Sequence, residues 1–294
     1  MVLIGFDPLL MKCRYTATQN ATAKDTLDTL RQSVGIQPQN QYGGYWYFKY
    51  PNWSYLDGMY SLVPFMTYYT QHFDSANAPA VTDDIIHQLD LFWTHCRQNT
   101  TGLLVHGYDA SKKASWAYPV TGASPFAWSR SLGWYFMALV DTLELVRSMP
   151  GVFPKKLERY LDARFVELTK AVVAAADAKT GCWYQVMEYP GREGNYIESS
   201  GSAMFTYVLY KGARLGYSPA GSEQEYIDLA EKCYGYLVGA FVNEDPKNGT
   251  LAYNGTVGVC SLDSSASYEV RTWFYRYWVG ANAIAVLHLA TSAV

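Results

Sequence analysis

Helical periodicity dominates the pattern of hydrophobic and polar positions along the chain. Residues 85–96 place apolar side chains on one stripe of an amphipathic helix, which Thr82 or Asp83 could cap. The stripe consists of Ile85, Ile86, Leu89, Phe92, Trp93 and Cys96. Residues 157–173 and 226–242 repeat this pattern. We therefore predict three helices that each keep one face in water.

A second kind of helix is apolar nearly all round and should be buried on most sides, as in residues 134–146 and 203–209. Amphipathic helices with one solvent-exposed face alternate with buried helices. The buried helices begin about seventy residues apart, near Asp57, Trp128, Ser200 and Arg271. This rhythm predicts repeated helical hairpins. The fold class is therefore all-α, a ring of inner and outer helices, although we count about nine helices and six hairpins need about twelve.

Strand signals are few. The aromatic run 44–50 and the short run 182–187 could be extended loops or small hairpins. With 294 residues, 49% of them hydrophobic, and no Pro/Gly/Ser-rich linker, the chain is predicted to form a single domain over residues 1–294.

Charge and hydropathy exclude several classes of partner. The net charge of −3 is spread over the chain with both signs mixed, so we expect neither nucleic acid nor an anionic membrane surface as a partner. No apolar run is long enough for a transmembrane helix. The first residues also do not fit a signal peptide, because Asp7 and Lys12 interrupt their apolar run.

Cysteines and asparagines give clues to the compartment. The five cysteines form no CxxC pair, so we interpret them as small core residues with at most a bridge or two. Five of the ten asparagines open an N-x-[ST] sequon and are candidate glycosylation sites: Asn20, Asn52, Asn99, Asn248 and Asn254. This favours a secreted, extracellular protein, with a cytoplasmic location as the alternative.

The segment 50–65, YPNWSYLDGMYSLVPF, sets one carboxylate, Asp57, among five aromatic rings. Apolar surroundings raise the pKa of a carboxyl group and make it a usable proton donor. Aromatic rings also suit a sugar, whose C–H faces stack on them. The alternative is a buried, hydrogen-bonded aspartate that serves only at a helix start.

A glycine-flanked loop within residues 102–116 carries His106 and Asp109. Such a loop does not need histidine for packing, so His106 is the histidine best placed for function, with a structural role as the alternative. The other histidines lie on or beside predicted helices and are interpreted as structural: His72, His87, His95 and His288.

The segment 124–134, SPFAWSRSLGW, should begin a buried helix, with Ser124 as its cap and Pro125 in its first turn. Arg130 and Trp134 then lie on one helical face. An arginine between Trp128 and Trp134 offers a forked donor to a carboxylate and rings to a sugar. A structural arginine with cation–π contacts is the competing interpretation.

Residues 181–216 hold further polar groups, Arg192, Glu193, Asn195 and Glu198, ahead of the small-residue run 199–203. These residues could reach a pocket mouth, but loop and packing roles explain most of them. There is no GxSxG, HExxH, P-loop or dinucleotide motif, so we expect neither a metal nor a cofactor.

Together, YPNWSYLDGMY, HGYD, WSRSLGW and WYQV…REGNY-ESSGSAMF resemble glycoside hydrolase family 105, the unsaturated rhamnogalacturonyl hydrolases. The resemblance covers essentially the whole chain. It implies an (α/α)6 six-hairpin barrel and removal of a Δ4,5-unsaturated uronic acid from pectin fragments, the galacturonyl-rhamnose unit of rhamnogalacturonan. The related family 88 acts similarly on unsaturated glucuronyl glycans.

By this resemblance Asp57 is the general acid and base, while His106, Trp128, Arg130 and Trp134 bind the unsaturated sugar. Two further substrate-binding positions of the family carry Tyr47, where histidine is frequent, and Tyr55, where tryptophan is frequent; Asp109 belongs to the same loop as His106. The partner is then an unsaturated oligosaccharide, bound by a monomer or homodimer.

The chain departs from the family at its front, where a second pocket aspartate is expected about fifty-five residues before Asp57 and Asp7 aligns poorly. We therefore expect a barrel that is incomplete at its N-terminus. Arg276 and Tyr277 also replace an Asn-Asp pair. The alternatives are a non-catalytic carbohydrate-binding relative, an unsaturated glucuronyl hydrolase, or, outside the sugar proteins, a helical scaffold with buried aromatic residues.

Overall fold

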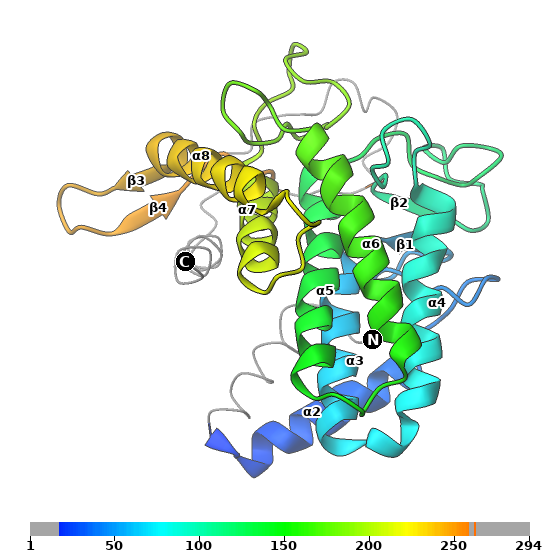
Figure 1. The fold of residues 1–294 in the computed structure, drawn as a ribbon. Coiled ribbons are helices and arrows are strands. Elements are labelled where there is room, and N and C mark those ends of the chain that lie inside the picture. The colour runs from blue at the N-terminus through cyan, green and yellow to red at the C-terminus, as the bar shows by residue number, and fades with distance from the viewer. Residues whose placement is uncertain (1–17, 259–261, 263–294) are drawn as a thin grey trace. The chain divides into compact units, whose positions relative to one another are not determined.

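The computed structural model describes residues 18–258 and residue 262, and these are mostly helical (Figure 1). The described residues contain seven α-helices: α2 (Ala21–Gly35), α3 (Gly58–Phe73), α4 (Ala78–Cys96), α5 (Ser129–Ser148), α6 (Lys155–Ala174), α7 (Ser199–Arg214) and α8 (Glu223–Phe241). A short 3-10 helix, η1 (Ser75–Asn77), joins α3 to α4. The expected helical character is thus confirmed for this part of the chain, while the six-hairpin barrel, expected to be incomplete at its N-terminus, stays a prediction. The expectations for Asp7, Arg271, Arg276 and Tyr277 lie outside the described residues.

The chain divides into two compact units. Of the described residues, unit 1 comprises 18–97, 107–124 and 138–164, and unit 2 comprises 98–106, 125–137, 165–258 and 262. Helices α5 and α6 therefore each contribute residues to both units. The expectation of a single domain over residues 1–294 stays a prediction.

Two short strands organise unit 1 around the start of α3. β1 (Trp53–Tyr55) pairs antiparallel with β2 (Gly107–Asp109), with Trp53 opposite Asp109 and Tyr55 opposite Gly107. Gly107 permits this pairing, because a Cβ atom there would lie 2.4 Å from the Ser54 carbonyl oxygen. The aromatic run 44–50 forms turns and one isolated bridge, between Gln39 and Tyr45. The ladder thus fixes the chain immediately before Asp57.

Helix α4 packs against α3 in unit 1 and begins one turn earlier than the sequence predicted. The predicted caps, Thr82 and Asp83, are wrong: the N-cap is Asn77, and Pro79 occupies the first turn, where its missing N–H costs nothing. Thr82 instead lies fully buried within the helix. The predicted stripe is confirmed at its centre, since Ile85, Leu89, Phe92 and Cys96 are buried.

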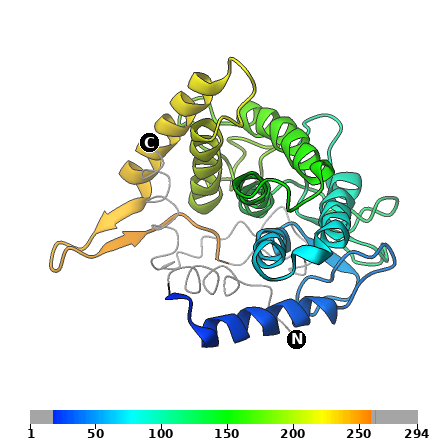
Figure 2. The same ribbon diagram turned by 60° about the horizontal axis from the view of Figure 1, so that its bottom comes forward.

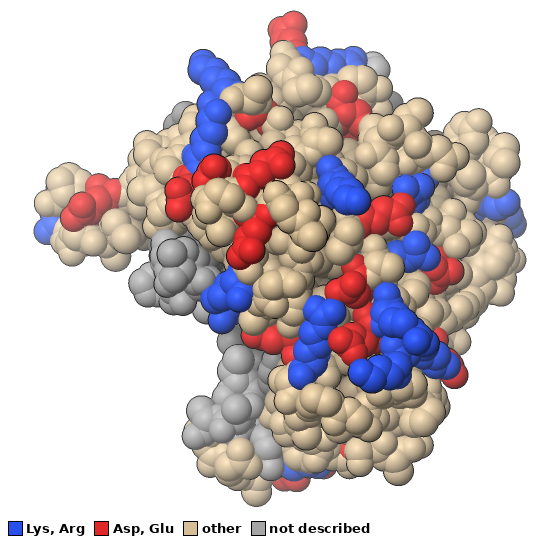
Figure 3. Space-filling view, in the orientation of Figure 1, with Lys and Arg blue, Asp and Glu red and all other residues tan. Residues whose placement is uncertain are grey.

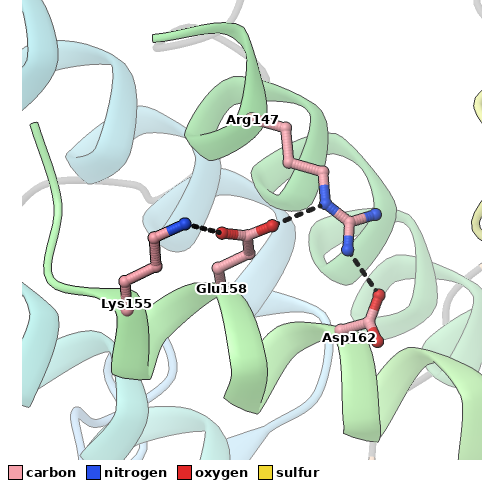
Figure 4. Close-up of polar contacts among 4 residues, drawn as sticks. All are labelled: Arg147, Lys155, Glu158 and Asp162. Carbon is pink, nitrogen blue, oxygen red and sulfur yellow. Dashed lines mark hydrogen bonds and ion pairs between the residues drawn. The ribbon is translucent and has the colours of Figure 1, made fainter. Parts of the chain in front are cut away.

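Charged side chains of both signs are interspersed over α4 and α6 (Figure 3). In unit 1, Arg147 joins two carboxylates of α6, with Nε 3.0 Å from Glu158 and Nη2 2.7 Å from Asp162, and Lys155 lies 3.9 Å from Glu158 (Figure 4). Exposed pairs of this kind contribute about 0–1 kcal/mol each, so they orient the α5–α6 turn more than they stabilise it. Within the described ranges, no helix is both long and apolar enough to span a membrane.

Unit 2 is built on α7, which packs along α8 (Figure 1, Figure 2). Helix α7 is buried on nearly all sides, as its sequence predicted, whereas α8 buries only one stripe of Tyr226, Ala230, Cys233 and Leu237. A disulfide between Cys182 and Cys233 ties the loop before α7 to α8. After α8, the hairpin of β3 (Val242–Glu244) and β4 (Leu251–Tyr253) leads the chain back toward the start of α7.

The start of α7 lies so close to the start of α5 that only glycine fits at position 201. A Cβ atom on Gly201 would lie 2.7 Å from both the Arg130 nitrogen and the Ser129 carbonyl carbon, which are backbone atoms that cannot turn aside. We expect Gly201→Ala to lower the free energy of unfolding by about 1–3 kcal/mol. The measurement is a urea titration of wild type and variant.

Gly235 in α8 provides the matched control, because a Cβ atom there would meet no atom within 4 Å. Gly235→Ala should raise the free energy of unfolding by about 0.5–1 kcal/mol, since alanine restricts the unfolded chain and favours the helix. Equal effects of the two substitutions would contradict the close approach of α5 and α7.

Candidate active site

The residues expected to act on substrate are distributed over both units. Unit 1 holds Asp57, Tyr47, Tyr55 and Asp109, and unit 2 holds His106, Trp128, Arg130 and Trp134. Among the described residues, no group of three or more His, Cys, Asp or Glu side chains could hold a metal ion. The metal-free and cofactor-free site stays a prediction, and each set of residues is described within its own unit.

Asp57 stands between β1 and α3 and occupies the N-cap position of α3. Its side chain makes no capping hydrogen bond, because its backbone is already helical, with φ −52° and ψ −38°. The carboxylate is thus half-buried and does not cap α3, and its catalytic role stays a prediction.

An aromatic column precedes Asp57 in unit 1. The rings of Tyr47 and Tyr55 stack at 4.6 Å and 11°, Tyr50 lies parallel to Tyr55 at 6.0 Å, and Trp53 continues the column beside Tyr50 at 5.1 Å. Tyr47 also borders the start of α3, since a Cβ atom on Gly58 would lie 3.5 Å from its ring. Three of the five rings in segment 50–65, Tyr50, Trp53 and Tyr55, are thus gathered with Tyr47 into one column.

Asp109 is fully buried, and both of its carboxylate oxygens serve its own loop. Oδ1 accepts from the backbone and hydroxyl of Ser111 at 2.8 and 2.7 Å, and Oδ2 accepts from the backbone of Lys113 and Ala114 at 2.8 Å each. These four bonds account for the aspartate as the organiser of the loop. Its substrate-binding role stays a prediction, and the contacts favour a structural one.

His106 and Trp128 form a ring pair in unit 2. Their centroids lie 4.7 Å apart at 30°, and both side chains are buried. The backbone supports the pair, because the His106 N–H donates to the Phe126 carbonyl at 3.1 Å. The two residues, 22 positions apart in the sequence, therefore act as one structural element.

Arg130 and Trp134 occupy the first two turns of α5, as predicted, and both are half-buried. The predicted cap is wrong: α5 begins at Ser129, and the Ser124 hydroxyl instead accepts from the Gly107 N–H at 3.2 Å. Arg130 Nη1 donates to the Val257 carbonyl. This bond uses one of the five N–H donors of the guanidinium group.

Glu198 is a structural carboxylate of unit 2 that the sequence had left among the loop candidates. It caps α7, accepting from the Gly201 N–H at 2.6 Å and from the Ser200 hydroxyl at 2.8 Å, and it is fully buried. It also accepts from the Val257 N–H at 3.0 Å. Glu198 therefore binds the N–H of Val257, and Arg130 binds the carbonyl of the same residue.

The five sequons differ in exposure. Asn99 and Asn248 are exposed, and Asn20 is exposed but uses its Oδ1 to cap α2. Asn52 and Asn254 are half-buried, and the hydroxyl residues of their sequons, Ser54 and Thr256, are buried. Glycosylation of all five stays a prediction, and Asn99 and Asn248 are the most accessible.

Glu188 lies in the loop before α7 and is a titratable group that the sequence did not single out. Its Oε1 accepts from Gln98 Nε2 at 2.5 Å and from the Ala127 N–H at 2.8 Å. Burial raises the pKa of the Glu188 carboxyl, and its hydrogen bonds, led by the one from the Ala127 N–H, only partly oppose this shift.

The raised pKa predicts a pH dependence of stability. The folded state keeps the Glu188 proton to higher pH than the unfolded chain, so the stabilisation is complete below the ordinary glutamate pKa and is lost as the pH rises through the raised value. Glu188→Gln, which does not titrate, should therefore gain stability relative to wild type as the pH increases from about 4 to about 8. Denaturant titrations across this range measure the difference, and parallel profiles would contradict it.

The chain matches the family model described as Glycosyl Hydrolase Family 88 over residues 6–291. It is similar to Protein Atu3128 of Agrobacterium fabrum, with 36% identity over 202 residues, 68% of this chain and 81% of the relative. Among solved structures, it is similar to a family 105 glycoside hydrolase of C. acetobutylicum, with a TM-score of 0.82 and 29% identity, covering 97% of this chain and 77% of that one.

A second solved structure is similar in fold. The unsaturated glucuronyl hydrolase of Bacillus sp. GL1, responsible for the degradation of glycosaminoglycan, matches with a TM-score of 0.59 and 14% identity, covering 86% of this chain and 66% of that one. The family resemblance seen in the four sequence motifs is thus confirmed. The chain belongs to glycosyl hydrolase family 88, with family 105 glycoside hydrolases among its structural relatives.

Proposed function

We propose that this glycoside hydrolase removes a Δ4,5-unsaturated uronic acid from the end of an oligosaccharide, with Asp57 as its general acid and base. The observation that carries the proposal is the placement of Asp57: its side chain does not cap α3, and it follows a column of aromatic rings. The fold shared with an unsaturated glucuronyl hydrolase supports the same class of substrate.

The substrate explains how one carboxylate can suffice, where ordinary glycosidases use two. An unsaturated uronate is a vinyl ether. Asp57 protonates C4 of the double bond, and the resulting positive charge is shared by C5 and the ring oxygen. Water then adds at C5 and gives its proton to the Asp57 carboxylate. The hemiketal opens and expels the remaining glycan, so that Asp57 ends the cycle protonated, as it began.

The other residues bind the sugar in this proposal. Arg130 offers a forked donor to the uronate carboxylate, and Trp128 and Trp134 offer ring surfaces to the sugar. His106, stacked on Trp128, orients the water or a hydroxyl group. Tyr47 and Tyr55 adjust the sugar preference, which we propose to be galacturonyl linked to rhamnose, from pectin, with glucuronyl as the alternative.

Lyase-generated oligosaccharides test the proposal, because loss of the double bond removes its ultraviolet absorbance. We expect the absorbance to decay in proportion to enzyme concentration and a saturated aglycone to be released. Binding without any decay would identify the chain as a carbohydrate-binding relative and would sink the enzymatic proposal.

Arg130→Lys should raise KM about tenfold, a loss of about 1.4 kcal/mol, because a point charge replaces a planar fork. The substitution should change kcat much less if the interaction holds the substrate equally before and during reaction. Steady-state kinetics on the same oligosaccharides provide the measurement. Unchanged kinetics would assign Arg130 a structural role, of which its bond to the Val257 carbonyl is one part.

A further inference from the structure

The Glu188 carboxyl connects three segments of unit 2. Besides its bonds to Gln98 and Ala127, it belongs to a loop that pairs with the chain on both sides of Trp128. The Met187 N–H donates to the Ala127 carbonyl at 3.0 Å, and the Ser129 N–H donates to the Gln185 carbonyl at 3.0 Å. The backbone of Trp128 is therefore held on both sides by residues 185–188.

The same arrangement extends to His106. Its N–H donates to the Phe126 carbonyl, and Gln98 begins the segment that leads to it, with its own N–H bonded to the Leu103 carbonyl at 2.9 Å. Phe126 also packs edge-to-face against Tyr189, the residue after Glu188, at 5.5 Å. Glu188 thus contacts the two segments that carry the stacked pair of His106 and Trp128.

The second oxygen of Glu188 makes this carboxyl unusual. Oε2 is buried and has no hydrogen-bond partner among the described residues, while Oε1 accepts two. Burying a carboxyl group with one of its two oxygens unbonded costs more free energy than filling the same volume with an apolar side chain. What it provides, and an apolar side chain does not, is an acceptor for the Ala127 N–H beside Trp128.

We propose that Glu188 is a positioning residue that fixes the backbone of Trp128, and with it the His106–Trp128 pair, for sugar binding. The inference rests on the proposed function, which assigns these two residues to the sugar. Glu188 itself touches neither substrate nor reacting atoms. It acts through the Ala127 N–H and the Gln98 amide.

Two substitutions separate the acceptor from the charge. Glu188→Leu removes the acceptor and should raise KM about tenfold, with kcat within about twofold of wild type. Glu188→Gln keeps an oxygen that can accept both bonds, so its KM should remain within about twofold of wild type. Rescue by glutamine but not by leucine is the signature of positioning through hydrogen bonds.

Asp177→Ala is the matched control in unit 2. The Asp177 carboxylate also organises a loop, accepting from the Thr180 N–H and hydroxyl at 2.8 Å each. These bonds involve neither residues 185–188 nor the segment around Trp128. It should lower stability without changing KM. Should Glu188→Leu not fold, Gln98→Ala removes one of the two donors and should raise KM about threefold.

Hydrogen exchange provides a readout that does not depend on turnover. In Glu188→Leu, amides of residues 125–131 should exchange at least about tenfold faster than in wild type, whereas Asp177→Ala should leave them unchanged. Absence of wild-type turnover would overturn the proposed function, and exchange would still decide whether Glu188 holds this segment. Unchanged exchange at 125–131 in Glu188→Leu, or equal KM values for Leu, Gln and wild type, would overturn the positioning role.

Discussion

Asp57→Asn should reduce turnover of unsaturated oligosaccharides by about two to four orders of magnitude, the usual contribution of a general acid and base. Asparagine has nearly the same shape but can neither protonate C4 nor take a proton from water. Because asparagine preserves the size and shape of a side chain that does not cap α3, the fold should be largely retained. Kinetics by ultraviolet absorbance measure turnover, and a thermal melt measures folding. Binding of the intact substrate, which should be largely retained, is the third measurement.

Asp109→Asn separates catalysis from folding in the same unit. Its carboxylate accepts four hydrogen bonds within its loop, so asparagine there should lower the melting temperature, because an amide nitrogen cannot accept from the backbone N–H groups. Substantial activity in Asp57→Asn would move the proton donor elsewhere. Asp109 would be the next candidate only if its own variant lost turnover while remaining folded.

Glu198→Ala should have the largest effect on stability, lowering the free energy of unfolding by about 3 kcal/mol. The substitution leaves the Gly201 and Val257 N–H groups and the Ser200 hydroxyl without their acceptor. Burial of Ser200 and Gly201 prevents water from replacing their lost bonds cheaply. The measurement is a urea titration monitored by circular dichroism.

Glu244 in β3 supplies the control, because it is an exposed glutamate of the same unit. Glu244→Ala should change the free energy of unfolding by less than about 0.5 kcal/mol. A Glu198→Ala variant as stable as Glu244→Ala would show that the capping carboxylate does not hold the start of α7. In that case the bond between Glu198 and the Val257 N–H would not be needed to position Arg130, which donates to the Val257 carbonyl.

The sequence predicted the helices well where one buried stripe decides the structure. Apolar periodicity located α6 and α8, and continuous apolar runs located α5 and α7, since burial of these side chains dominates helix stability in a folded chain. The sequence did not predict correctly where α4 and α5 begin. Both Ser124 and Thr82 can cap a helix, but Ser124 accepts a bond from Gly107 and Thr82 is buried inside α4.

The sequence could not separate structural acids from candidate catalytic ones where the contacts join distant parts of the chain. Asp57 and the rings of Tyr50, Trp53 and Tyr55 lie within a short segment, so their closeness along the chain was evident from the sequence. Glu188 accepts from Ala127, 61 positions away, and Glu198 accepts from Val257, 59 positions away. Because a carboxylate suits a backbone N–H as well as a substrate, residue type alone could not separate structural acids from a catalytic one.

The most direct test of the central claim compares two disaccharides that differ only in the double bond of the uronic acid. Protonation of C4 by Asp57 requires the vinyl ether. We therefore predict release of the second sugar from the unsaturated disaccharide and none from its saturated counterpart, and release from the unsaturated disaccharide should fall by about two to four orders of magnitude in Asp57→Asn. Equal release from the saturated disaccharide would contradict it, because cleavage would then proceed without the double bond.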